Sequence, residues 1–128
     1  AKIHTTYKWS PNKKFIHADV NIEEQGLSIA AEQVIGLDPE TGTLRSWTFE
    51  ADGGVGEAEW NRDGDHWVLD VAGSLVDGTS LIETNILRRV DADTLTWQSV
   101  DRELNGSEIA DLPPTKVVRM KPATGAAR

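Results

Sequence analysis

The chain has 128 residues, which is enough for one domain with its own hydrophobic core. Its formal charge of −8 argues against nucleic acid or an anionic membrane surface as a partner, because both require a basic footprint. The lack of cysteine excludes disulfides, thiolate nucleophiles and cysteine-based metal sites. No apolar run approaches the roughly 20 residues of a membrane span, and no signal-peptide pattern is present. We expect a soluble protein, either cytoplasmic or exported.

The first third of the sequence predicts three strands. Residues 2–9 are rich in β-branched and aromatic side chains and end at a Ser-Pro-Asn turn signal. Residues 15–22 alternate apolar and polar side chains, so these two runs are predicted to form a hairpin. Residues 27–38 contain an Ala-Ala-Glu-Gln centre that favours a helix locally. Apolar residues at every second position, with Pro39 at the end, favour a strand instead.

Regular turn signals divide the rest of the chain. They are the Pro-containing turn at 38–42, Asp52-Gly53, Asp63-Gly64, Asp77-Gly78, the corner at 91–94 and Asn105-Gly106. Each interval has room for one strand and its turn but not for a crossover helix, so successive strands should be antiparallel neighbours. A longer connection through Pro113-Pro114 leads to a last strand at 115–121.

These elements predict an all-β fold, an antiparallel up-and-down meander of about nine strands. A sheet of this length usually closes to remove its edges, so we expect a β-barrel. The barrel domain should cover residues 1–121, followed by a flexible tail at 122–128.

Strand registers follow if each Asp-Gly pair is the centre of a two-residue hairpin loop. This assumption places Arg45 opposite Trp60, Trp60 opposite Trp67, and Trp67 opposite Arg88. A four-residue loop at 91–94 then sets Trp97 opposite Arg88, whereas a three-residue loop would turn Trp97 outward. The predicted interior, and with it the candidate ligand-binding set, is Arg45, Trp47, Trp60, Trp67, Thr84, Arg88, Trp97, Ser99 and Asp101.

Two interpretations of this interior row remain open. In the first, the arginines stack on the indoles and close one end of a solid core, since each cation–π contact stabilises by about 0.5–2 kcal/mol. In the second, the aromatic walls hold a small hydrophobic ligand while Arg45 and Arg88 pair with its anionic group.

Other motifs give no support for catalysis. Residues 52–56 (DGGVG) lack the lysine and the helix of a phosphate-binding loop, so a hairpin turn is the better interpretation. His4, His17 and His66 do not have metal-ligand spacing. No serine has the sequence context of a nucleophile elbow. We therefore predict no catalytic residue, no metal and no cofactor.

Several ordered blocks of the sequence resemble a known family. They are residues 34–39 (VIGLDP), 45–49 (RSWTF), 52–57 (DGGVGE), 60–64 (WNRDG), 84–86 (TNI) and 96–102 (TWQSVDR). Together they resemble an uncharacterised bacterial lipocalin-like β-barrel domain that often follows a SnoaL-like domain of the nuclear transport factor 2 superfamily. The resemblance implies a calycin-like barrel and carries over no catalytic residues.

The beginning of the chain departs from this family pattern. Such domains usually start with a further strand that contains a Gly-x-Trp element. In this chain the first predicted strand begins at Lys2 and no such element precedes it. A barrel that lacks a strand has an open edge, and open edges pair with partners. We therefore expect a homodimer, or pairing with an N-terminal domain of a longer chain.

Three functional hypotheses follow. The leading one is a non-enzymatic module that binds a small molecule or serves as an accessory domain. The second, by analogy with the SnoaL-like neighbour, is an isomerase-like or cyclase-like enzyme with Asp101 as a buried base. The third is a purely structural or oligomerisation barrel with a solid core.

Overall fold

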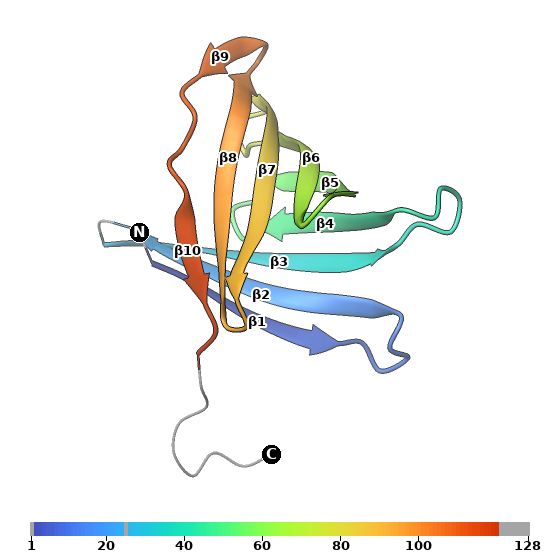
Figure 1. Ribbon diagram of the computed structural model, residues 1–128. Helices are drawn as coiled ribbons and strands as arrows, with labels where there is room; N and C mark the ends of the chain where they lie inside the picture. The colour runs from blue at the N-terminus through green and yellow to red at the C-terminus, as the bar shows by residue number, and fades with distance from the viewer. Residues whose placement is uncertain (1, 25, 121–128) are drawn as a thin grey trace.

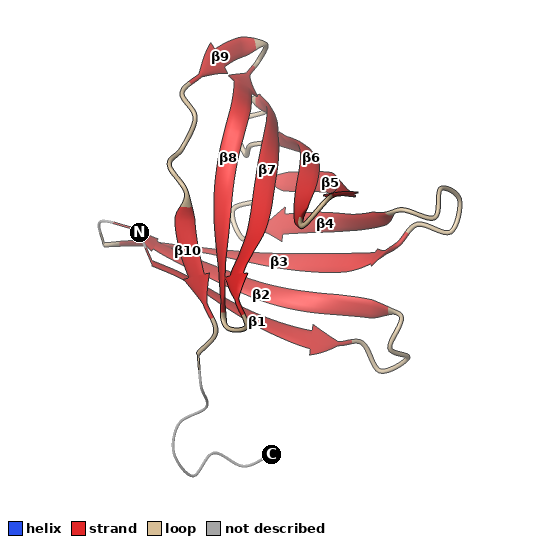
Figure 2. Cartoon of the chain, viewed as in Figure 1, coloured by secondary structure: helices blue, strands red, loops and turns tan. Residues whose placement is uncertain are grey.

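The computed structural model describes residues 2–24 and 26–120, and the tail predicted at 122–128 lies outside them. All regular structure in the described residues is β-strand (Figures 1 and 2). The strands are β1 (Lys2–Trp9), β2 (Phe15–Glu24), β3 (Leu27–Leu37), β4 (Leu44–Glu50), β5 (Val55–Asp63), β6 (His66–Ser74), β7 (Ser80–Asp91), β8 (Thr94–Leu104), β9 (Ser107–Ile109) and β10 (Thr115–Val118). The all-β prediction is confirmed.

The strands form one antiparallel meander. Each strand from β1 to β7 pairs with the next in sequence, and the free edge of β8 then carries both β9 and β10. Strand β9 pairs with one end of β8 and β10 with the other, so the sheet is nine strands wide. In the described part of the chain β1 and β10 are the two edges and no ladder joins them. The sheet is therefore open, and strongly twisted along its width (Figure 1).

The predicted turns are present, but their loop lengths differ. Gly53, Gly64, Gly78 and Gly106 all have positive φ angles, between 63° and 104°, which glycine adopts without steric cost. Only the Asn105-Gly106 hairpin has the predicted two-residue loop centred on its signal. The hairpins at 52–53 and 77–78 have three-residue loops, closed by Glu50 N–H donating to Gly54 O and Leu75 N–H donating to Thr79 O, each at 2.8 Å.

These loop lengths correct the predicted registers. Arg45 lies opposite Glu59 instead of Trp60, and Trp67 lies opposite Leu87 instead of Arg88. One extra loop residue moves a strand by one position and turns its side chains to the other face. At 63–64 the loop is Gly64-Asp65, which moves the register by two positions and keeps the predicted face.

The hydrophobic core lies on one side of the sheet, which we call the inner face. It carries Ser46, Ala58, Leu69 and Ser99, all of them buried, and it continues to Ala18 on β2. We call the opposite side the outer face.

Candidate functional site

The structure divides the nine predicted site residues between three places. The inner face carries Trp60, Trp67, Trp97 and Ser99; the outer face carries Arg45, Trp47, Thr84 and Arg88; Asp101 is exposed at a β-bulge. The predicted continuous Trp/Arg row is wrong, because the three-residue loops before β5 and β7 each exchange the two faces. The register between β7 and β8 also differs by one position, so that Trp97 lies opposite Leu87 instead of Arg88.

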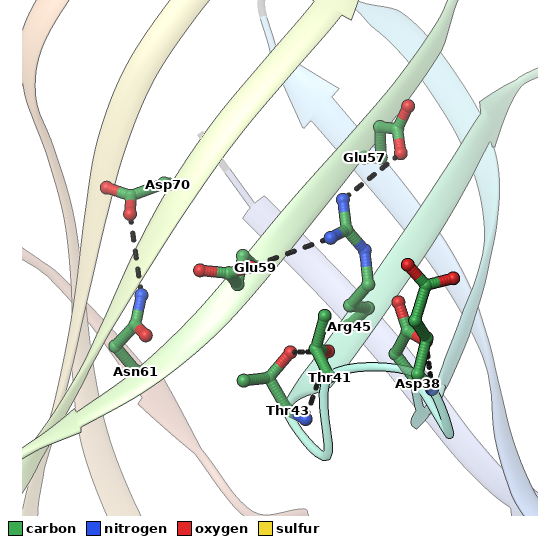
Figure 3. Close-up of polar contacts among 9 residues, drawn as sticks. Asp38, Thr41, Thr43, Arg45, Glu57, Glu59, Asn61 and Asp70 are labelled. Carbon is green, nitrogen blue, oxygen red and sulfur yellow. Dashed lines mark hydrogen bonds and ion pairs between the residues drawn. The ribbon is translucent and has the colours of Figure 1, made fainter.

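The two arginines of the predicted row make polar contacts on the outer face. Arg45 Nη2 lies 3.4 Å from Glu57 Oε2, and Arg45 Nη1 lies 3.6 Å from Glu59 Oε2 (Figure 3). Arg88 Nη1 lies 3.3 Å from His66 Nδ1. These contacts are partly exposed, so each contributes little to stability. Neither arginine is placed to meet a ligand on the inner face.

The tryptophans on the inner face form a smaller cluster. The rings of Trp60 and Trp67 meet edge to face, with centroids 5.9 Å apart and planes at 69°. The guanidinium carbon of Arg62 lies 5.4 Å from the ring centroid of Trp67, so Arg62 provides the cation–π contact expected of Arg45 or Arg88. Trp60 Nε1 donates a 3.0 Å hydrogen bond to the buried Ser46 Oγ.

A β-bulge in β8 determines which charged residue enters the inner face. The ladder with β7 shifts between Ile82 and Thr84, so that Asp101 and Arg102 together oppose Glu83. Asp101 occupies the left-handed region with φ of 49° and is exposed. Arg102 Nε then lies 3.7 Å from Glu83 Oε1. The bulge pairs Glu83 with a cation, and it contradicts the expected burial of Asp101.

Four polar side chains from β7 and β8 form what we call the inner polar cluster: Glu83, Asn85, Ser99 and Arg102. Asn85 lies directly opposite Ser99, whose residue exposure is 0%, while Glu83 is 8% exposed. Among the residues that the structure describes, the buried side-chain polar atoms without a hydrogen-bond partner are Asn85 Oδ1, Ser99 Oγ and Arg102 Nε. All three belong to this cluster. Such atoms are rare in folded proteins, because each costs about 1–3 kcal/mol.

The tryptophans and the inner polar cluster adjoin one another. Trp60, Leu69, Asn85 and Ser99 are successive partners in one row across β5 to β8. Trp97 is two residues from Ser99 on the same face of β8, a spacing of about 7 Å along a strand. Aromatic rings and unsatisfied polar atoms therefore border one area of the inner face.

A hollow with a volume of about 510 Å³ lies on the outer face, over β1 to β4. Its lining includes the exposed side chains of His4, Asp19, Asn21, Glu32 and Phe49. Exposed carboxylates retain their water, so these groups do not require a ligand.

Sequence reasoning found four members of this area, the three tryptophans and Ser99, but missed Glu83, Asn85 and Arg102. Alternation along β7 would have indicated that Glu83 and Asn85 share a face. Which face that is depended on the length of the loop at 76–78, and the position of Arg102 depended on the bulge.

The described residues offer no metal site and no membrane-spanning helix. No group of three histidine, aspartate or glutamate side chains there is arranged to hold a metal ion. The same residues contain no helix with the length and apolarity needed to cross a membrane.

The sequence matches no protein-family model and no curated protein.

Proposed function

We propose that this chain is a lipocalin-like module that binds a small molecule against its inner face. One observation carries the proposal: the buried polar atoms left without partners, Asn85 Oδ1, Ser99 Oγ and Arg102 Nε, gather in one cluster beside three tryptophans. A ligand with an apolar body and a polar end would satisfy these atoms and cover the rings.

The alternative of a solid core accounts less well for this cluster. A core that serves only stability pairs its buried polar atoms, as Ser46 does with Trp60 at 3.0 Å. Ser99 is equally buried on the same face, yet its Oγ has no partner. This difference favours a binding area around Ser99.

The open sheet fits the same proposal. The unpaired edges of β1 and β10 agree with closure by a partner strand, either in a homodimer or from another domain of a longer chain. In this interpretation the complete lipocalin-like barrel forms only in the assembly.

Native mass spectrometry of the protein purified from its producing cells tests the proposal directly. We expect a retained mass of a few hundred daltons together with an even number of subunits. Fluorescence quenching during titration with small hydrophobic compounds should be reduced in Trp60→Phe, because Trp60 borders the binding area together with Trp67 and Trp97. It should be unchanged in Trp9→Phe, because Trp9 is 59% exposed on the edge strand. An apo mass, combined with quenching that Trp60→Phe leaves unchanged, would refute binding at this area.

A further inference from the structure

The charges of the inner polar cluster balance one another, and from this we infer that the ligand presents an uncharged group with both a hydrogen-bond donor and an acceptor, as in an amide or lactam. The inference rests on the proposed function and specifies the chemical class of the ligand.

Glu83 and Arg102 are paired at 3.7 Å, and Asn85 and Ser99 are neutral, so the cluster carries no net charge. Transfer of a charged group from water to a buried neutral site is costly unless an opposite charge awaits it. Arg45, which could have met an anion, lies on the outer face between Glu57 and Glu59. A charged ligand group placed at the inner polar cluster therefore lacks a counter-charge there. Arg62, an inner-face cation outside the cluster, lies against the ring of Trp67.

The unpartnered atoms of the inner polar cluster include both hydrogen-bond donors and an acceptor. Arg102 Nε carries an N–H that can only donate, and the Ser99 hydroxyl can donate as well. A carbonyl oxygen of the ligand accepts from these two groups. Asn85 Oδ1 is an acceptor, and an N–H of the ligand donates to it. An amide or lactam offers both atoms about 2 Å apart on one planar group.

Two members of the inner polar cluster border the solvent. Glu83 and Ser99 are buried, whereas Asn85 and Arg102 are half-buried and border the solvent. Arg102 Nη1 is held by Ala110 O at 3.2 Å, in the connection between β9 and β10. Rotation of the Asn85 and Arg102 side chains admits the polar group of the ligand, while its apolar part lies toward Trp60 and Trp97.

Matched probes that share an apolar body and differ in the charge and type of the polar end group test the inference. Binding is measured by calorimetry at pH 7 for indole-3-acetamide, indole-3-acetate and tryptamine, and for nonanamide, nonanoate and nonylamine. We expect the amide of at least one set to bind about tenfold more tightly than both charged analogues, which corresponds to the loss of one well-formed buried interaction. A charged analogue that binds as well as its amide overturns the inference and leaves the proposed function standing. If none of the six binds, both fail.

Variants connect the preference to the cluster. Ser99→Ala should weaken amide binding about tenfold. Glu83→Gln should shift the preference toward the carboxylate, because Arg102 then lacks its counter-charge. Arg45→Gln, on the outer face, is the matched control and should change nothing. Circular dichroism checks the fold of each variant. If Glu83→Gln does not fold, the amide affinity of Ser99→Ala is the test of the inference. Unchanged amide affinity in Ser99→Ala would overturn the inference.

Discussion

Edge strand β1 and central strands β6 to β8 differ in how deeply their inner faces are buried. On β1 the inner side chains Tyr7 and Trp9 are 62% and 59% exposed, whereas Leu69 on β6 and Ser99 on β8 are 5% and 0% exposed. The inner faces of β1 and β6 are both mainly apolar in sequence. Alternation therefore sets which side chains share a face, but it does not set whether that face is covered.

The connection at residues 110–114 pairs with part of the edge of β8. Leu112 N–H donates to Ser99 O at 2.9 Å, and Gln98 Nε2 donates to Leu112 O at 3.2 Å. These bonds hold the connection along β8 beyond the end of β9. Strand β1 has no equivalent segment among the described residues. Apolar side chains stabilise a fold in proportion to the area removed from water, so the two regions should respond differently to the same substitution.

Leu69→Ala and Tyr7→Ala should show the largest difference between the two regions. Leu69→Ala removes a buried side chain and should lower the free energy of unfolding by about 2–5 kcal/mol. Tyr7→Ala removes a larger but mostly exposed side chain and should cost less than about 1 kcal/mol. Urea unfolding of both variants measures the difference. Equal losses would show that β1 is covered in solution, as expected if the edge is paired with a partner.

Two substitutions compare Ser46, whose hydroxyl accepts a hydrogen bond, with Ser99, whose hydroxyl has no partner. Ser46→Ala leaves the Trp60 indole N–H without its acceptor and should cost about 1–3 kcal/mol. Ser99→Ala removes a hydroxyl that has no partner, so ligand-free protein should keep its stability or gain a few tenths of a kcal/mol. Thermal unfolding of ligand-free protein measures both. A comparable loss in Ser99→Ala would mean that its hydroxyl is hydrogen-bonded in solution.

Asp101→Gly tests the bulge that supplies Arg102 to the covered region. Glycine adopts the φ of 49° found at Asp101 without steric cost, so this variant should gain about 0.5–1 kcal/mol in the free energy of unfolding. Asp101→Val should lose stability, since a β-branched residue tolerates this conformation poorly. Chemical unfolding of the pair measures both changes. The opposite order would show that β8 lacks the bulge in solution.

Acid should weaken the turns of the central strands first, and this is the smallest expected effect. The side-chain hydrogen bond with Thr79, followed by the backbone hydrogen bond from that residue, lowers the pKa of Asp77. The backbone hydrogen bond from Asp93 is the main cause that lowers the pKa of Asp91. A folded-state pKa below the unfolded value stabilises the fold above about pH 4, and this stabilisation is lost as the pH falls through the folded value.

Hydrogen exchange between pH 5 and pH 3 measures this effect. Protection factors, corrected for the intrinsic pH dependence of exchange, should fall at the β6–β7 and β7–β8 turns before they fall at the β1–β2 turn. Asp77→Asn is the control, because its amide does not titrate in this range and the change at the β6–β7 turn should disappear. A loss of protection that begins at the β1–β2 turn would contradict the assignment.

Most of the candidate area could not be predicted because small backbone details decide it. The two-residue loop assumed at 63–64 predicted that Trp60 and Trp67 share a face, and the structure confirms the shared face although the register differs by two positions. The three-residue loop at 76–78 then brought Asn85 inward in place of Thr84, and the bulge at Asp101 brought in Arg102. An Asp-Gly pair suits both a two-residue and a three-residue loop, so the local sequence does not distinguish them.

The sequence by itself determined every strand except β9, the antiparallel order of those strands and the position of nearly every turn. These features depend on side-chain periodicity and on local backbone preferences, and both act between residues close together in the chain. The tertiary structure alone decided the registers, the bulge and the covered part of the inner face. Those features depend on the combined packing of distant strands, where one inserted residue exchanges the two faces of everything that follows.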